Sequence, residues 1–276
     1  MMIAVVSGKG GTGRTTLTAA LAGLAPPPVV MADCNLESPN LDLFLSTALV
    51  SRRPLPGTPC AVIDAGTCVE CLSCVEHCVF GAISYRGGRF TVNPAACEGC
   101  GLCMKVCPVS APRMEPRTVG ELCLSETPYG LLSHARLFPG YSANGSLVAE
   151  VMRQAREAAG EEPLLLVDGP PGTGRALLAA VAGADLILVV TEPTAAGIRG
   201  LRRVVAACRD VGGAIGVVIG RSTRSPEMTG AIRRLCRDEG IGILGEVPFD
   251  DAAAAGFNPS AAPAYRQILD AIERLY

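Results

Sequence analysis

Short apolar runs alternate with amphipathic stretches along most of the chain. The runs are rich in β-branched residues and almost uninterrupted by polar ones, as in strands buried on both faces. They are Ile3–Val6, Pro28–Ala32, Leu164–Val167, Leu186–Val190, Ala214–Ile219 and Ile243–Val247. Five stretches of helix length carry charges on one side: Thr15–Leu24, Leu147–Ala159, Ala176–Ala182, Ile198–Asp210 and Glu227–Glu239. This alternation predicts an α/β fold with a mainly parallel sheet flanked by helices.

The proline-rich segment Arg53–Pro59 interrupts the alternation. Because proline has no amide N–H, this segment is incompatible with a helix or a central strand, and it predicts a linker. Residues 113–117, with a further proline, are expected to close the interrupted stretch in a similar way. Two runs of four cysteines lie between these segments.

Two further apolar runs follow the interruption. Val119–Ser125 and Leu131–Phe138 flank a Thr-Pro-Tyr-Gly turn and predict a hairpin at a sheet edge. We therefore expect one nucleotide-binding domain in two pieces, residues 1–57 and 117–276. A small α+β insert, residues 58–116, separates them.

The cysteine content narrows the class of protein. The chain has 13 cysteines among 276 residues, and its first residues include no basic segment and no cleavable apolar stretch. No apolar run approaches the ~20 residues that a membrane span requires. We therefore expect a cytoplasmic protein in which clustered thiols hold metal. The formal net charge of −2 gives no electrostatic reason to expect nucleic acid as a partner.

Two cysteine runs have the spacing of a bacterial two-cluster ferredoxin. The first is Cys68-x2-Cys71-x2-Cys74-x3-Cys78, and the second is Cys97-x2-Cys100-x2-Cys103-x3-Cys107, followed by proline. In this pattern the fourth cysteine of each run ligates the other [4Fe–4S] cluster. The expected ligands are Cys68, Cys71, Cys74 and Cys107 for cluster I, and Cys97, Cys100, Cys103 and Cys78 for cluster II.

Zinc and structural disulfides are the alternatives for these cysteines. Zinc sites usually take paired CxxC units with a longer gap, and disulfides do not suit a reducing compartment. His77 lies between two expected ligands, but the cysteine set is complete without it. The remaining cysteines share no spacing and are expected to be small buried hydrophobic residues: Cys34, Cys60, Cys123, Cys208 and Cys236.

A glycine-rich loop follows the first apolar run and opens the first helix. It reads Gly8-Lys9-Gly10-Gly11-Thr12-Gly13-Arg14-Thr15-Thr16, the arrangement of a Walker A loop. Its backbone N–H groups and the helix N-terminus would bind phosphates, and Thr15 would bind Mg²⁺. A chance glycine-rich turn is the alternative.

The motif expects Lys where Arg14 stands, and the planar guanidinium is bulkier than an ammonium. We expect nucleotide binding to survive this change and ATP hydrolysis to be weakened.

Two aspartates end apolar runs near this loop. Asp33 ends the second predicted strand, and Asp168 ends Leu164–Val167. A carboxylate at the tip of a parallel strand beside a P-loop is where a Walker B residue holds Mg²⁺. The alternative is a helix N-cap or turn residue.

The early lysine of the loop, Lys9, resembles the deviant Walker A motif of the MinD/ParA/Mrp ATPases and the nitrogenase iron protein. Asp33 with Asn40, Asp168–Gly172 and Val190–Thr194 resemble further landmarks of that superfamily. Together with the cysteine insert, essentially the whole chain is similar to MinD-superfamily ATPases that carry an inserted ferredoxin domain. Members of that subfamily occur in the orange-protein complex.

The resemblance implies a P-loop NTPase fold, and ATP or ADP with Mg²⁺ as ligands. It implies a dimer in which Lys9 reaches the phosphates of the partner subunit, and catalytic roles for Lys9, Asp33 and Asp168. The segment Ile219–Ser222 stands where the family has an Asn-Lys pair that contacts the base. Adenine contacts then fall to the region of Pro248, Phe249 and Asp250.

We therefore expect an ATP-binding protein in which nucleotide state gates electron transfer through two clusters to a redox partner protein. Two alternatives stay open. One is a carrier or assembly ATPase that hands an iron–sulfur or mixed-metal cofactor to an accepting protein. The other is a non-hydrolysing subunit that pairs with an intact paralogous ATPase, for which Arg14 is the reason. The dimer would then be a heterodimer rather than a homodimer.

Overall fold

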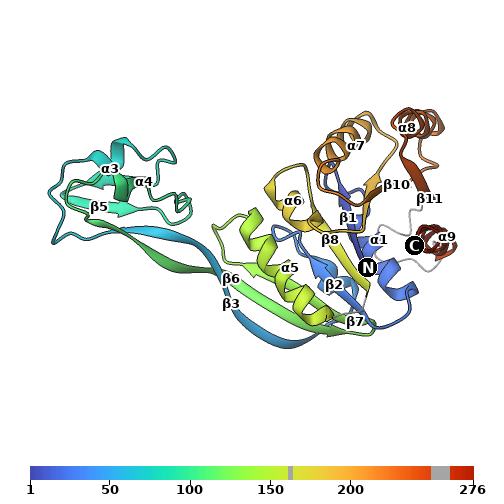
Figure 1. The fold of residues 1–276 in the computed structure, drawn as a ribbon, viewed down its shortest axis with the longest axis horizontal. Helices are drawn as coiled ribbons and strands as arrows, with labels where there is room; N and C mark the ends of the chain where they lie inside the picture. Colours follow the sequence, from blue (N-terminus) through green and yellow to red (C-terminus); the bar gives the residue numbers. More distant parts are fainter. Residues whose placement is uncertain (161–163, 250–261) are drawn as a thin grey trace. The chain divides into compact units, whose positions relative to one another are not determined.

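A nine-stranded sheet organises the part of the chain that the computed structural model describes, residues 1–160, 164–249 and 262–276. The strand order is β11-β10-β9-β1-β8-β2-β7-β6-β3 (Figure 1). Pairing is parallel from β11 through β7. The strands are β1 (Met2–Ser7), β2 (Val29–Asp33), β3 (Ala48–Ile63), β6 (Pro112–Thr127), β7 (Gly130–Leu137), β8 (Leu164–Pro171), β9 (Leu186–Thr191), β10 (Ala214–Gly220) and β11 (Gly242–Val247).

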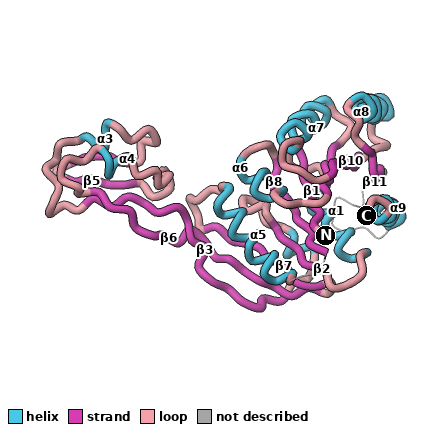
Figure 2. Tube along the Cα trace, in the orientation of Figure 1, coloured by secondary structure: helices cyan, strands magenta, loops and turns pink. Residues whose placement is uncertain are grey.

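Helices cover both faces of this sheet (Figures 1 and 2). On one face α1 contacts α9, and on the other α5, α6 and α7 form a contiguous series. The bounds are α1 (Arg14–Leu24), α2 (Leu41–Phe44), α5 (Gly145–Ala159), α6 (Arg175–Val181), α7 (Ala195–Cys208), α8 (Pro226–Asp238) and α9 (Ala262–Glu273). The predicted α/β class, with a mainly parallel sheet flanked by helices, is confirmed.

Three of these helices begin at a residue whose side chain caps the helix N-terminus. Asn144 Oδ1 accepts from the N–H of Leu147 at 3.1 Å at the start of α5. Thr194 Oγ1 accepts from the N–H of Gly197 at 3.0 Å at the start of α7. Ser225 caps α8, with proline in its first turn. Each cap satisfies an amide that has no partner within the helix, which is why these helices begin at these residues.

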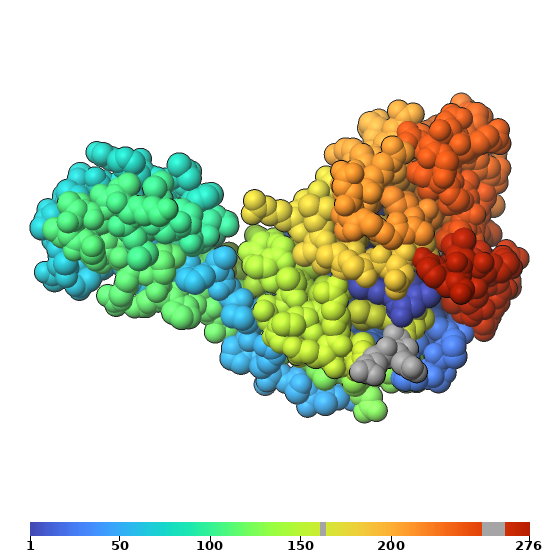
Figure 3. All heavy atoms as spheres, viewed as in Figure 1, coloured from blue at the N-terminus to red at the C-terminus, as the bar shows by residue number. Residues whose placement is uncertain are grey.

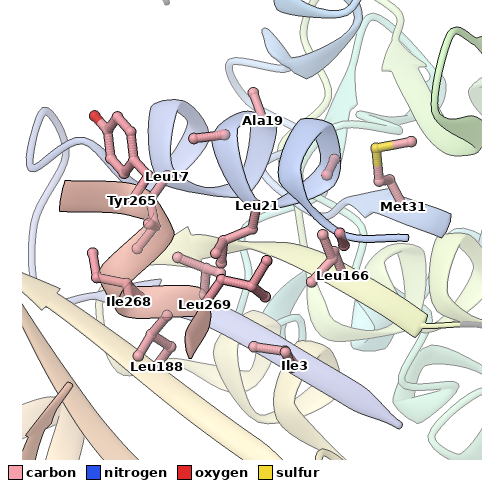
Figure 4. Close-up of a cluster of buried hydrophobic side chains, with 14 of the residues drawn as sticks. Ile3, Leu17, Ala19, Leu21, Met31, Leu166, Leu188, Tyr265, Ile268 and Leu269 are labelled. Atoms are coloured by element: carbon pink, nitrogen blue, oxygen red, sulfur yellow. The ribbon is translucent and has the colours of Figure 1, made fainter. Parts of the chain in front are cut away.

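The core lies between the sheet and the helices α1 and α9 (Figure 4). Leu17 and Leu21 of α1 pack with Ile268 and Leu269 of α9, over Ile3 of β1. Each of these side chains is at most 4% exposed. Full burial of such a side chain contributes about 1.5–3 kcal/mol, so this cluster holds the last helix onto the first. In the space-filling view the C-terminal helix, red, adjoins the orange segment that contains α8 and β11 (Figure 3).

The proline-rich segment is a strand rather than the predicted linker. Arg53–Pro59 lies within β3, and residues 113–117 lie within β6. β3 is the last strand of the sheet, and an edge strand tolerates proline because one row of its amides needs no strand partner. The expected hairpin is present as β6 and β7, joined by two residues, but β3 lies outside it, so the hairpin is not at the edge.

The described chain divides into two compact units. One comprises Met1–Arg53, Leu122–Arg136 and Ala143–Tyr276, and the other comprises Pro54–Glu121 with Leu137–Ser142. The second unit contains both cysteine runs, two one-turn helices and an antiparallel two-stranded sheet. These elements are α3 (Ser73–Glu76), β4 (Ile83–Arg86), β5 (Arg89–Val92) and α4 (Leu102–Lys105). Among the described residues, no helix is long and apolar enough to cross a membrane.

Candidate nucleotide and iron–sulfur sites

The glycine-rich loop and both aspartates meet at the carboxyl ends of the central strands. The loop connects β1 to α1, and Asp33 and Asp168 are direct partners in the register of β2 and β8. Parallel strands end at the same edge of a sheet, so the order β1-β8-β2 places the two carboxylates beside the loop. Ligands bind at this edge in open α/β sheets.

Asp33 is buried and held by its own loop. It accepts hydrogen bonds from the N–H groups of Asn35 at 3.0 Å and of Asn40 and Leu41 at 3.1 Å. Burial, with the charge of Asp168 added, raises the pKa of Asp33 to about 7 despite these bonds. Asp33 therefore both organises the turn after β2 and supplies an ionisable group to the site.

Asp168 pairs with the loop threonine expected to bind Mg²⁺. Thr15 Oγ1 donates to Asp168 Oδ2 at 2.6 Å. Burial raises the pKa of Asp168 to about 6, although Arg14 and Thr15 act to lower it. Asp168 Oδ1 and Thr12 Oγ1 are buried without a hydrogen-bond partner among the described residues. Buried polar atoms are nearly always paired, so these two fit a site that receives a phosphate group and a hydrated cation.

The Arg14 side chain is directed toward the end of β8. Its Nη1 donates to the carbonyl oxygen of Gly169, and the residue is 6% exposed. The charges of Asp168 and Asp33 act on its guanidinium. Arg14 is not among the residues that line the neighbouring pocket. The expected contact between Arg14 and phosphate remains a prediction.

A pocket opens beside the loop at the ends of β10 and β11. Its lining includes Pro248 and Phe249, the residues expected near adenine, whereas Asp250 lies outside the described residues. Arg224 stacks on the Phe249 ring, with its guanidinium carbon 5.2 Å from the ring centroid. Tyr265 of α9 also lines the pocket and was not predicted. The complete lining is Thr12, Gly13, Thr16, Leu17, Val190, Val218, Gly220, Arg221, Val247, Pro248, Phe249 and Tyr265.

Lys9 and Arg221 share one carboxylate. Lys9 Nζ forms an ion pair with Glu192 Oε1, and Arg221 Nη1 donates to Glu192 Oε2 at 2.6 Å. Burial acts to raise the pKa of Glu192, but the hydrogen bonds from Lys9 and Arg221 outweigh it and lower this pKa. Glu192 belongs to a family-like segment, but its pairing with Lys9 was not predicted, because it depends on contact between β9 and the loop.

The start of the loop lies directly on the backbone of α7. A Cβ added at Gly8 would lie 2.3 Å from the Cα of Gly200. No side chain fits at that distance, so only glycine allows this approach. A Cβ at Gly10, in the same loop, would have no atom within 4 Å.

Gly8→Ala is therefore expected to destabilise the protein by about 1–3 kcal/mol, the range for an overpacked site. Gly10→Ala, the matched control, is expected to change the free energy of unfolding much less. Urea denaturation without nucleotide measures both. Equal stability of the two variants would show that the loop does not depend on the contact with Gly200.

Two cavities in the second unit are each lined by cysteines from both runs. One is lined by Cys68, Cys71, Cys74 and Cys107, and the other by Cys78, Cys97, Cys100 and Cys103. The fourth cysteine of each run thus lies with the first three of the other. Ala82 N–H donates to Cys78 Sγ and Ala111 N–H donates to Cys107 Sγ, both at 3.3 Å. This equivalence matches the internal repeat of the two runs.

The spacing of these cysteines fits a group larger than one ion. Among residues 1–160, 164–249 and 262–276, no three Cys, His, Asp or Glu side chains are grouped closely enough to hold a single metal ion. The sulfurs of a tetrahedral zinc site would lie about 3.8 Å apart, given a Zn–S distance of about 2.3 Å. Four cysteines spread around a cavity suit a [4Fe–4S] cubane, which their thiolates would hold at its corners.

The backbone around each second cysteine also fits a bound group. Glu70 and Leu72 flank Cys71 with φ of 55° and 62°, and Gly99 and Gly101 flank Cys100 with φ of 67° and 71°. Positive φ is unfavourable for Glu and Leu, and such residues persist where the surroundings or a ligand require them.

The other cysteines are all buried, as expected for small hydrophobic residues. Burial raises the pKa of Cys208 and of Cys236 to about 11, which keeps both thiols protonated. Cys60 differs in position, because it packs with Cys97 beside the second cavity. His77 is exposed, and its Nδ1 lies 2.9 Å from the carbonyl oxygen of Ser73.

Comparison with known proteins finds similar proteins for the cysteine unit and for the whole chain. Residues 61–114 match the family model of a 4Fe-4S dicluster domain. The chain is 30% identical over 208 residues to the uncharacterized protein MJ0578 of Methanocaldococcus jannaschii, covering 74% of this chain and 72% of that protein. It is 25% identical over 287 residues to the uncharacterized ATP-binding protein MJ0547 of the same organism, covering 99% of this chain and 86% of that protein.

Among solved structures, the fold is similar to that of the septum site-determining protein MinD complexed with Mg-ADP from Pyrococcus horikoshii. The TM-score is 0.60 at 19% identity, over 99% of this chain and 96% of that chain. The chain thus belongs to the same family as MJ0578, with a 4Fe-4S dicluster domain at residues 61–114 and a fold similar to that of MinD.

Proposed function

We propose that this protein binds ATP and couples its nucleotide state to electron transfer through two [4Fe–4S] clusters to a protein partner. The observation that carries this proposal is the presence, in one chain, of a P-loop pocket and of two cavities each lined by four cysteines. Residues 58–116 would form the electron-carrying domain. Residues 1–57 and 117–276 would form the nucleotide-binding domain.

The iron–sulfur ligands would be two crossed sets. Cys68, Cys71, Cys74 and Cys107 would hold cluster I, and Cys97, Cys100, Cys103 and Cys78 would hold cluster II. When bound, the clusters supply one-electron redox chemistry at low potential. The protein positions the thiolates and donates N–H groups to the sulfurs of Cys78 and Cys107.

The nucleotide would lie along the loop and the adjoining pocket. The amides from Gly10 to Thr16, at the start of α1, would bind its phosphates. Thr15 and Asp168 would hold Mg²⁺, and Asp33 would orient the attacking water. Phe249 and Tyr265 would contact the base. The name of MJ0547 as an ATP-binding protein, and the Mg-ADP in the similar MinD structure, support this assignment.

Lys9 would act between two subunits. In the single chain its ammonium is paired with Glu192. To reach the phosphates of a partner subunit it must leave this carboxylate, which Arg221 would continue to neutralise. The partner would be a second copy or a paralogue, and the occurrence of both MJ0578 and MJ0547 in one organism supports the second option.

The covalent path between the two units favours coupling. The chain enters the cysteine unit within β3 and returns within β6, without an intervening loop. These two continuous strands support the proposal that nucleotide state in one unit is coupled to the cysteine unit.

A second candidate function is that of a non-hydrolysing subunit. The contact of Arg14 with Gly169 favours this function, because the guanidinium then donates a hydrogen bond to the backbone rather than to a phosphate oxygen. Such a subunit would bind nucleotide and pair with an intact paralogue that supplies hydrolysis.

The function is tested by measuring cluster potentials with and without Mg-ATP. Anaerobically prepared protein should hold about eight irons per chain, and Mg-ATP should shift at least one midpoint potential and promote dimerisation. Lys9→Ala should keep nucleotide binding by a single chain but lose the dimer and the shift. Arg234→Ala, which removes an exposed charge on α8, is the matched control.

Two outcomes would contradict this proposal. Stoichiometric zinc in place of iron would exclude the redox function. Bound Mg-ATP with unchanged potentials would exclude the coupling, and release of the clusters to an apo-acceptor in the same sample would favour the carrier function.

A further inference from the structure

Resting on the proposed function, we infer that the two clusters differ in potential, and that cluster II has the higher one because its surroundings carry more positive charge. Cluster II is the one held by Cys97, Cys100, Cys103 and Cys78. The first electron delivered by a one-electron reductant such as dithionite would then reside at cluster II. The two ligand runs are internal repeats, so they can be compared position by position.

Arg117 of β6 places a guanidinium against the ligand loop of cluster II. Its Nη2 donates to the carbonyl oxygen of Cys97 at 3.0 Å and to Thr58 Oγ1 at 3.2 Å, and Nη1 donates to the carbonyl oxygen of Pro94. The guanidinium stacks on Tyr141, 5.5 Å from the ring centroid, and its Nε is buried. A partly buried charge is screened little by water, so it stabilises an added electron nearby.

The turn before each run differs by one charge. Asp64 accepts from Cys68 N–H at 3.0 Å through its carbonyl oxygen, and its Oδ1 accepts from Gly66 N–H at 3.3 Å. Asn93 makes the same two bonds ahead of Cys97, to Cys97 N–H at 3.1 Å and to Ala95 N–H at 3.0 Å. The geometry is the same, but cluster I has a carboxylate where cluster II has an amide.

A third difference lies on the two short helices. α3 ends at Glu76, two residues after a ligand of cluster I, and α4 ends at Lys105, two residues after a ligand of cluster II. Both side chains are exposed, so their effect is smaller than that of Arg117 and falls with salt.

Two arginines of the β4–β5 hairpin, Arg86 and Arg89, add positive charge on the side of cluster I, where Phe90 lines the cavity. Both are exposed, so water and salt screen them more than the partly buried Arg117.

Each ligand loop carries one glutamate, Glu70 in the first and Glu98 in the second. Arg113 acts on Asp64, but it is paired with Glu115 at 2.8 Å. Because net charge and hydrogen bonding set the potential of an iron–sulfur cluster, the imbalance favours reduction at cluster II.

The test is a redox titration of the full cluster-loaded chain, monitored by electron paramagnetic resonance. The unaltered protein should show two one-electron midpoints. Arg117→Gln should lower the upper midpoint and spare the lower one, and Arg117→Lys, which keeps the charge, should lower it less. Asp64→Asn should raise only the lower midpoint. Arg89→Gln, which removes an exposed charge beside Phe90 of the cluster I cavity, should lower only the lower midpoint, and slightly.

Asn93→Asp is a second variant that tests the same inference if Arg117→Gln fails to fold. The new carboxylate can still accept from Ala95 N–H, so the turn is retained, and the upper midpoint should fall. A shift of the lower midpoint by Arg117→Gln or Asn93→Asp, or coincident midpoints in the unaltered protein, would overturn the inference while leaving the two-cluster assignment intact. An iron content below two cubanes would overturn the proposed function itself.

Discussion

Replacing Cys78 by alanine is expected to damage the cluster whose other ligands lie 19 to 25 residues further along the chain. Cys78 lines the same cavity as Cys97, Cys100 and Cys103. Loss of one thiolate leaves one iron of that cubane without a protein ligand, so the iron content should fall below about eight per chain, and the [4Fe–4S] spectrum that remains should be that of cluster I. Cys107→Ala should have the converse effect on the cluster of Cys68, Cys71 and Cys74.

Iron analysis and electron paramagnetic resonance of the two variants measure this outcome. Cys236→Ala is the control, because its thiol is buried in α8 and outside both cavities. If each variant instead lost the cluster of its own cysteine run, the crossed assignment would be wrong.

Arg14→Lys is expected to raise the rate of ATP hydrolysis by about tenfold or more, which corresponds to about 1.4 kcal/mol of transition-state stabilisation. The Arg14 guanidinium donates to the carbonyl oxygen of Gly169 and lies near the charges of Asp33 and Asp168. A lysine ammonium is compact and can lie between the β- and γ-phosphates, where charge develops during phosphoryl transfer. The unaltered protein should bind ATP but turn it over slowly.

The measurement is steady-state phosphate release together with equilibrium binding of ATP. Arg153→Lys, the same exchange at an exposed position of α5, is the control. Brisk hydrolysis by the unaltered protein, with no effect of Arg14→Lys, would mean that Arg14 already does the work of the lysine. The non-hydrolysing-subunit function would then be excluded.

The local pattern of apolar and polar residues was sufficient to predict the central strands of the sheet and most of the helices. The uninterrupted apolar run Leu186–Val190 is β9 with one residue added, because a strand covered on both faces has no polar position. The glycine-rich loop was placed correctly between a strand and a helix, because a Walker A pattern requires that context. Crossed lining of the cavities by Cys78 and Cys107 followed from spacing alone, since a short chain can wrap two cubanes in few ways.

The segment Arg53–Pro59 shows where local pattern misleads. Its prolines correctly excluded a helix and a central strand, but they did not exclude an edge strand. Whether such a segment pairs depends on what its neighbour offers, and β6 lies more than fifty residues away in the chain. The pairing of β3 with β6 therefore cannot be inferred from a short stretch of sequence.

The sequence by itself determined which chemical groups this protein has: two sets of four cysteines, a glycine-rich loop with an early lysine, and two carboxylates at strand ends. Only the tertiary structure decided their partners. It directed Arg14 to Gly169, paired Lys9 with Glu192, brought Tyr265 to the pocket and set Arg117 against Cys97. The contacts of Arg14, Lys9 and Arg117 join residues at least 20 positions apart. Their geometry is fixed by the packing of whole elements, whereas motifs and periodicity report only on neighbours along the chain.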